Sequence, residues 1–128
     1  MPRTERRTGV RYAVKRCTAL FRRRRMFLLF EKEAHHGPVV DMSSHGIGFL
    51  TRRTLHVGDV IRIALDMAMP YELSTIPPGF EIRAKVAWIA AAQGEPGLKR
   101  VGCTFHRASK TERDLITRII RFGILRER

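Results

Sequence analysis

A regular alternation of apolar and polar residues is the feature of this chain that most limits how it can fold. In residues 80–88 every second side chain is apolar, from Phe80 to Trp88, and three charged side chains lie between them. Residues 60–67 and 101–105 alternate in a similar way. A period of two is typical of strands with one buried face. We therefore predict a strand for each run, and we expect Trp88 to lie in the core.

Residues typical of turns bound these runs. They occupy positions 57–59, 76–79 and 94–97, and each group contains glycine. Short strands separated by such turns favour a barrel or a sandwich over a parallel sheet. At 128 residues the chain has the length of one domain, which can bury a core without disulfides.

The region that follows these strands has the pattern of a helix. Ser109 and Glu112 have the spacing of a capping box, in which each side chain bonds the backbone of the other residue. Gly123 is expected to end the helix. Its apolar stripe consists of Leu115, Ile116, Ile119 and Ile120. We expect this stripe to pack against the strands; the alternative is a dimerisation helix whose apolar surface is extended by Ile124 and Leu125.

Residues 12–40 show neither a clear alternation nor a helical period, and we predict two strands there. Within them, residues 22–25 are four consecutive arginines followed by the apolar run 26–30. We interpret the arginines as the solvated end of a hairpin. A patch for nucleic acid or for a membrane surface is the alternative.

Positive charge is concentrated near the start of the chain. Residues 1–25 contain ten lysines and arginines and one acidic residue, so nine of the thirteen net positive charges lie in this segment. Such an asymmetry indicates a basic arm that meets an anionic partner. A solvated tail that only keeps the protein soluble is the alternative.

Two short segments carry residues suited to one ligand. The first is Arg7-Thr8-Gly9-Val10-Arg11, and the second is Asp41-Met42-Ser43-Ser44-His45-Gly46. Arginine grips phosphate, or the O6/N7 edge of guanine, with paired hydrogen bonds. A carboxylate only accepts, so Asp41 suits the N–H donors on the other edge of guanine. Together the two segments describe a pocket for an anionic guanine nucleotide.

In these two segments the chain resembles the PilZ domain family, the bacterial receptor modules for cyclic di-GMP. The family signature is Arg-x-x-x-Arg followed by Asp/Asn-x-Ser-x-x-Gly, and every signature position is matched. The resemblance covers about residues 6–122. It implies an all-β fold, a six-stranded antiparallel β-barrel with a C-terminal α-helix. We accordingly expect a basic arm at 1–12 that carries the arginine motif, the barrel with its helix at 13–123, and a tail at 124–128.

The resemblance also implies the residues that bind cyclic di-GMP. Arg7 and Arg11 would grip phosphates and guanine edges, and their guanidinium planes could stack on the bases. Asp41 and Ser43 would take the remaining polar edge of guanine. Gly46 would permit the turn and a close approach of the backbone. If Asp41 and Ser43 face solvent in the empty protein, alanine in their place should leave the melting temperature nearly unchanged and greatly weaken binding.

The residue before the motif, Arg6, suggests the stoichiometry. PilZ domains take cyclic di-GMP either singly or as a stacked dimer, and the dimer brings four phosphodiester charges into one pocket. A third arginine beside Arg7 and Arg11 supplies an extra cation, so we expect two ligands per chain. The alternative is that Arg6 points into solvent and one ligand binds.

We therefore expect the protein to be a signalling receptor and not an enzyme. Binding is expected to order residues 1–12 onto the barrel, and the ordered arm would be recognised by a downstream protein that the sequence does not identify. Two other functions remain open: a small barrel that binds RNA or single-stranded DNA, and an adaptor that acts without ligand. Few exposed aromatics argue against the first, and the intact motif argues against the second.

Cysteine and histidine point to no other chemistry. Cys17 and Cys103 lack metal-binding spacing, and we expect reduced, structural thiols in the cytoplasm, with Cys103 on the inner face of its strand. None of the five histidines has metal-ligand spacing, and no histidine is placed as a base for Ser43. The apolar runs are too short to span a membrane. We therefore expect no cofactor, no metal, no catalysis and no membrane insertion.

Overall fold

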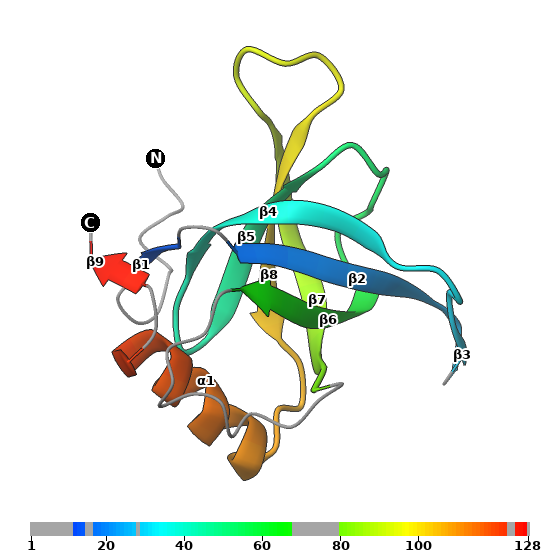
Figure 1. Ribbon diagram of the computed structural model, residues 1–128. Helices are drawn as coiled ribbons and strands as arrows, with labels where there is room; N and C mark the ends of the chain where they lie inside the picture. The colour runs from blue at the N-terminus through cyan, green and yellow to red at the C-terminus, as the bar shows by residue number, and fades with distance from the viewer. Residues whose placement is uncertain (1–11, 15–16, 28, 68–79, 123–124, 128) are drawn as a thin grey trace.

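The computed structural model describes residues 12–14, 17–27, 29–67, 80–122 and 125–127. Its six long strands form a closed antiparallel barrel (Figure 1). Around the barrel the strands follow in the order β2 (Cys17–Met26), β6 (Val60–Met67), β7 (Ile82–Ala91), β8 (Lys99–Phe105), β5 (Gly46–Thr51) and β4 (His35–Met42). Pairing of β4 with β2 closes the ring. The predicted six-stranded antiparallel barrel is confirmed.

Three short strands extend this barrel at two places. β3 (Leu29–Phe30) folds back on the end of β2. β1 (Tyr12–Val14) pairs with β4 on one side and with β9 (Leu125–Glu127) on the other. Figure 1 shows β3 at one end of the molecule and β1 with β9 at the other. The residues expected to form two strands between 12 and 40 therefore form four.

The core of the barrel consists of the alternating apolar residues. Ile61 and Ile63 of β6, and Val101 and Cys103 of β8, belong to one buried cluster. Phe21 and Phe49 are fully buried there, and their ring centroids are 4.9 Å apart. The alternation of these strands thus identifies their inner faces correctly.

Trp88 departs from that alternation, and the expectation that it lies in the core is wrong. A β-bulge separates Val86, which pairs with Cys103, from Trp88, which pairs with Gly102. The extra residue reverses the facing of every later side chain. Trp88 consequently lies on the outer face with 36% of its surface exposed, whereas Val86 is buried.

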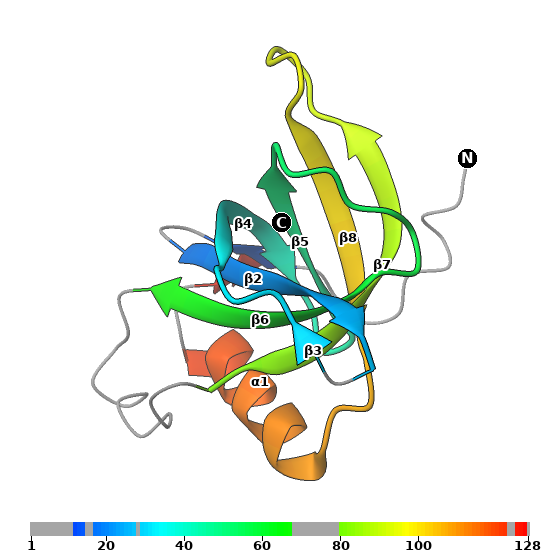
Figure 2. The ribbon, with the colours of Figure 1, turned by 90° about the vertical axis from the view of Figure 1, so that its right-hand side faces the viewer.

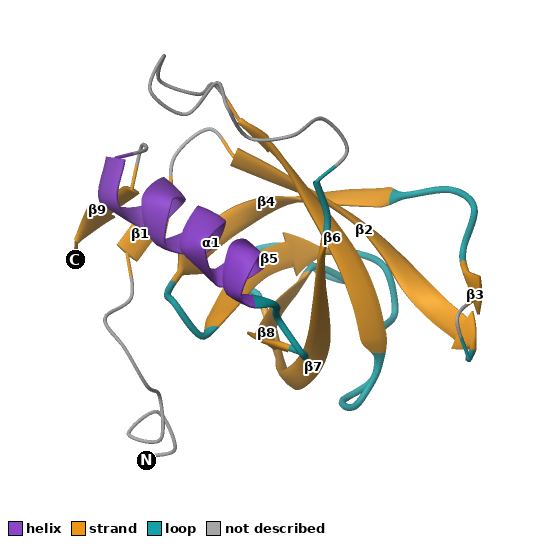
Figure 3. Cartoon of the chain, turned by 90° about the horizontal axis from the view of Figure 1, so that it is seen from below, coloured by secondary structure: helices purple, strands orange, loops and turns teal. Residues whose placement is uncertain are grey.

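The helix α1 (Lys110–Phe122) begins as the sequence predicts. The Ser109 backbone N–H donates to Oε1 of Glu112 at 2.8 Å, and the Glu112 backbone N–H donates to Oγ of Ser109 at 3.1 Å. Ile116 and Ile119 join the barrel core, so the packing of the helix against the strands is confirmed. Figure 3, in which the molecule is seen from below, shows α1 lying across the strands. Gly123 and Ile124, which bear on how the helix ends and on its role in a dimer, lie outside the described residues.

The hairpin of β7 and β8 is longer than its neighbours and projects from the barrel (Figure 2). Gly94 and Gly97 in its turn have φ angles of 84° and 81°, in the left-handed region that favours glycine. In the part of the chain that the structure describes, no helix is long and apolar enough to cross a membrane, and no three metal-binding side chains gather.

Both cysteines are free and buried. Burial raises the pKa of Cys103 to about 12, and burial together with the charge of Asp66 raises the pKa of Cys17 to about 12. At neutral pH both groups are thiols and not the reactive thiolates. We expect Ellman's reagent to label neither cysteine in the folded protein and both after denaturation in guanidinium. Rapid labelling of the native protein would contradict this burial.

Candidate functional site

The segment 41–46 spans the end of β4 and the turn into β5. Ser43 donates its backbone N–H to the carbonyl of Gly46 at 2.9 Å, and its Oγ accepts from the backbone N–H of His45 at 3.1 Å. Backbone bonds of this kind are typical of Ser in turns. His45 lies in the turn, and its carbonyl accepts from the N–H of Phe105 at 2.9 Å. These bonds fix the turn between β4 and β5 against the end of β8.

Asp41 forms an ion pair with a residue far away in the sequence. Nη2 of Arg100, on β8, lies 2.9 Å from Oδ2 of Asp41. A carboxylate and a guanidinium held in this way form a charge-assisted hydrogen bond. The Asp41 side chain retains 12% of its exposure and the Arg100 side chain 39%, so the pair lies at the surface with the carboxylate beneath.

The condition that Asp41 and Ser43 face solvent is not met in this structure. Asp41 is 8% exposed and Ser43 is fully buried. The physical reason is that both polar groups find partners in the fold, Asp41 through Arg100 and Ser43 through the turn backbone. Ser43 therefore shapes the site through the backbone that it holds, and Asp41 presents a carboxylate that is already oriented.

Gly46 permits a close approach, and the group that approaches is part of the barrel. A Cβ at this position would lie 2.1 Å from the carbonyl oxygen of Cys103 on β8. Gly48, two residues on, has a related role because a Cβ there would lie 2.8 Å from Oδ1 of Asp41. Because Gly46 has no side chain, the backbone of β8 can pack closely against it. Because Gly48 has none, the carboxylate of Asp41 can lie over it.

Four residues of the outer wall form a row across four strands. Asp41 of β4 pairs with Gly48 of β5, Gly48 pairs with Gly102 of β8, and Gly102 pairs with Trp88 of β7. The Trp88 ring lies directly over Gly102, since a Cβ there would be only 2.2 Å from Cε2 of the indole. The row thus places a carboxylate and an aromatic ring at the two ends of a floor made of glycine backbone.

Arg100 joins the two ends of this row. Its Cζ lies 5.9 Å from the centroid of the Trp88 ring, within the range of a cation–π contact. Its Nη2 reaches Asp41, while its Nε is buried with no hydrogen-bond partner in the part of the chain that the structure describes. We call Asp41, Arg100 and Trp88, with Gly48 and Gly102, the outer platform.

The strand β1, which directly follows the first motif in the sequence, lies beside the platform. Tyr12 pairs with Met42, and Ala13 pairs with Asp41. Arg11 is the residue before Tyr12, and consecutive Cα atoms are about 3.8 Å apart. The chain therefore passes beside Asp41 directly after the arginine motif. Arg6, Arg7 and Arg11 themselves lie outside the described residues.

The sequence motif indicates Asp41, Ser43 and Gly46 as neighbours. It does not indicate the other residues of the outer platform, which are Arg100, Trp88, Gly48 and Gly102. Gly48 and Gly102 did carry a signal, because glycine inside a strand often marks a site where another group approaches closely. Arg100 carried none, since nothing in the local pattern indicates a partner on β4. Trp88 was assigned to the wrong face because an alternation pattern does not reveal a bulge.

The platform suits a planar, polar ligand with negative charge. An exposed indole offers a stacking surface, a guanidinium can both stack and donate, and a carboxylate accepts from N–H groups. Groups of this kind recognise a ligand through stacking and hydrogen bonds.

Comparisons with known proteins agree with this architecture. The model of one protein family, described as the PilZ domain, matches residues 5–122. Among solved structures, the PilZ domain of YcgR from Escherichia coli, determined with c-di-GMP, is similar with a TM-score of 0.54 and 18% identity, over 90% of this chain and 88% of that chain. At this identity the likeness concerns the fold. A comparison with curated proteins finds no match.

Proposed function

Because this chain belongs to the PilZ domain family, whose model matches residues 5–122, we propose that it is a receptor for cyclic di-GMP. The ligand would lie on the outer platform, held from the other side by the arginines of the N-terminal motif. The similar domain of YcgR was solved with this dinucleotide, which supports the choice of ligand.

One observation carries the proposal: the pairing of β1 with β4. Arg7 and Arg11 are 30 and more residues away from Asp41 in the sequence, yet β1 brings Ala13 directly opposite Asp41. Only Tyr12 separates Arg11 from Ala13 in the sequence. Both halves of the motif can then engage one molecule.

The residues would act as follows. Arg7 and Arg11 bind phosphate and the O6/N7 edge of a guanine. Asp41 accepts from the N–H groups on the opposite edge, and it shares its charge between the ligand and Arg100. Trp88 and the plane of Arg100 stack on a base. Ser43 and Gly46 contribute by holding the turn that orients Asp41, which replaces the direct contacts expected from the sequence.

Calorimetry with cyclic di-GMP, GMP and a salt-matched RNA oligonucleotide tests the proposal. We expect binding of cyclic di-GMP in the micromolar range or tighter, roughly −8 kcal/mol or below, and much weaker binding of GMP. Two linked guanines and two phosphates engage both motif halves, whereas a mononucleotide engages one. Equal affinity for GMP would refute the dinucleotide assignment, and tight binding of RNA alone would favour a nucleic-acid-binding barrel.

We further propose that two molecules bind per chain, through the extra positive charge of Arg6. Two stacked ligands bring four phosphodiester charges together, and a third arginine fork offsets part of their repulsion. Calorimetry should give a stoichiometry near two for the wild type and near one for Arg6→Leu. A value near one for both proteins would exclude the stacked pair and leave the receptor assignment standing.

The output is proposed to be a surface made jointly by the arm, the ligand and the barrel. Once ligand bridges Arg7 and Arg11 to Asp41, the arm has a defined position that a downstream protein can distinguish from the empty state. A pull-down with and without cyclic di-GMP, using Arg11→Ala as the control, should recover a partner only from the wild type with ligand.

A further inference from the structure

The hairpin of β2 and β3 ends in apolar side chains that the barrel does not cover. Met26 is 57% exposed, Phe27 83% and Leu29 63%. We call Met26, Phe27 and Leu29 the hairpin tip. Figures 1 and 3 place β3 at the end of the molecule opposite to β1 and β9. The tip therefore lies at the end of the barrel opposite to β1, the strand that pairs beside Asp41 of the outer platform.

Phe27 is held in a backbone conformation that its own side chain disfavours. Its φ angle is 49°, in the left-handed region where asparagine or glycine is the usual residue and a bulky side chain is strained. Because the ring is exposed, burial within the chain does not offset that strain. An exposed aromatic residue at a strained position points to a contact outside the chain.

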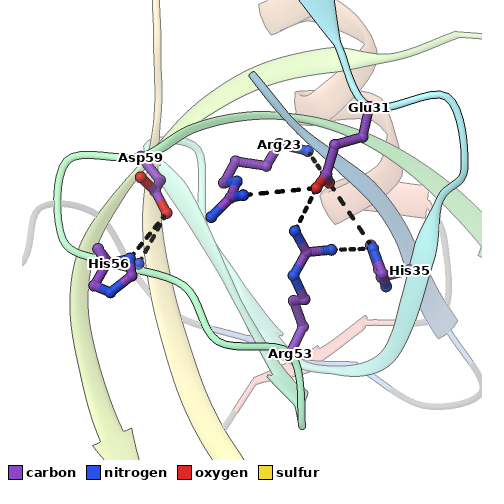
Figure 4. Close-up of polar contacts among 6 residues, drawn as sticks. All are labelled: Arg23, Glu31, His35, Arg53, His56 and Asp59. Carbon is purple, nitrogen blue, oxygen red and sulfur yellow. Dashed lines mark hydrogen bonds and ion pairs between the residues drawn. The ribbon is translucent and has the colours of Figure 1, made fainter. Parts of the chain in front are cut away.

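The base of the hairpin is clamped, so the tip is presented by a rigid stem. Figure 4 shows Glu31 between Arg23, Arg53 and His35. The Glu31 backbone N–H donates to the carbonyl of Arg23 at 3.0 Å, and the Arg23 backbone N–H donates to Oε1 of Glu31 at 3.0 Å. Arg53 donates to Glu31 and contacts His35. Burial alone would raise the pKa of Glu31, but the hydrogen bonds and charges of the two arginines outweigh it and lower that pKa.

The clamp also divides the four consecutive arginines into two kinds. Arg22 is paired with Glu81 at 2.8 Å, and Arg23 lies 3.8 Å from Glu31. Arg24 and Arg25 are exposed, and neither forms an ion pair with any residue that the structure describes. Among the described residues, no carboxylate therefore pairs with the two arginines next to the hairpin tip.

Positive charge continues from the hairpin onto the neighbouring strands. Burial of His106, together with the charges of Arg107, Lys85, Arg83 and Arg24, lowers its pKa. Arg22 of β2 pairs with Arg62 of β6, and Arg62 pairs with Arg83 of β7, so cationic residues cross this wall of the barrel and give it a positive potential. Such a potential attracts an extended anionic surface.

We propose that the hairpin tip inserts into the interfacial layer of an anionic phospholipid bilayer, with Arg24 and Arg25 at the headgroups. Apolar side chains that enter the headgroup boundary, flanked by basic residues, are the elements of reversible membrane-surface binding. The contact is peripheral and crosses no bilayer. It revises the sequence-based expectation of no membrane insertion, and it does not depend on cyclic di-GMP.

A bilayer fits this surface better than a second copy or a protein groove. Two copies that met at their tips would bring Arg24 and Arg25 of both chains together, which is repulsive at a net charge of +13 per chain. The tip is a narrow protrusion of three exposed side chains, too small for the area that a stable protein interface requires. A fluid lipid surface deforms around such a protrusion.

Depth-dependent fluorescence quenching tests insertion, because a protein this basic adheres to any anionic vesicle through charge alone. In a Trp88→Phe background, Phe27→Trp should show a blue-shifted emission and quenching by brominated lipid with vesicles of equal parts phosphatidylglycerol and phosphatidylcholine. Gln93→Trp, at an exposed position in the turn between β7 and β8, is the matched control and should show neither. Equal quenching at both positions, or none at position 27, would overturn the proposal.

A sedimentation assay with the same vesicles measures the energetic contribution. Phe27→Asn with Leu29→Ser should lower the partition coefficient at least about tenfold, while the melting temperature stays the same or rises, since asparagine suits the φ of position 27. Arg24→Gln with Arg25→Gln should also weaken binding about tenfold. The charge-matched pair Arg113→Gln with Arg118→Gln on α1 should change it little. Unaltered sedimentation of the tip variant would refute insertion.

Discussion

Alanine in place of Arg11 is expected to reduce the affinity for cyclic di-GMP at least about tenfold. The substitution removes one or more charge-assisted hydrogen bonds, each of which contributes about 1.5–3 kcal/mol. Arg11 is the residue for which the structure offers the strongest positional argument, because the next residue, Tyr12, pairs with Met42 beside Asp41. Calorimetry at fixed ionic strength measures the loss.

A matched control separates this contact from the overall charge of the protein. Arg25→Ala removes the same charge near the end of β2, where the side chain is exposed; this end of β2 pairs with β3, which lies at the opposite end of the molecule from β1. It should leave the affinity for cyclic di-GMP within about twofold, because exposed charges beyond a Debye length are largely screened. If both variants lose the same affinity, binding depends on general electrostatics and the motif has no specific role.

Two aromatic substitutions are expected to have opposite effects on stability and on binding. Phe21→Ala should lower the free energy of unfolding by about 3–5 kcal/mol, because it leaves a cavity in the core. Phe21 is fully buried, and its ring packs against Phe49. Trp88→Ala should cost less than about 2 kcal/mol, because the indole is partly exposed on the outer wall over Gly102.

Binding should show the reverse order. Loss of the Trp88 ring removes a stacking surface worth about 1–3 kcal/mol per base, so the affinity for cyclic di-GMP should fall about tenfold. Folded Phe21→Ala should bind as the wild type does. Guanidinium unfolding and calorimetry on the two variants measure both quantities. A stability loss for Trp88→Ala as large as that for Phe21→Ala would place the indole back in the core and remove it from the site.

The local pattern determined more of the fold than of the site. The alternation of apolar residues indicates the inner faces of β6 and β8, and the capping box indicates where α1 begins. The family signature indicates Asp41, Ser43 and Gly46 as candidate site residues. Each of these depends on residues close together in the chain, where the period of a strand or the geometry of a cap leaves few choices. The resemblance to PilZ domains implies a barrel of six strands. The family match and the closed barrel support that number.

Only the tertiary structure decided which groups meet on the outer wall. Arg100 reaches Asp41 across 59 residues of sequence, and the bulge after Val86 turns Trp88 outward over Gly102. Register between distant strands sets both results, and a single inserted residue reverses the facing of all that follow. The burial of Asp41 and the pairing of Arg22 with Glu81 have the same cause, because each partner lies 59 residues away in the sequence. A polar side chain is exposed or buried according to the partner that another strand brings to it.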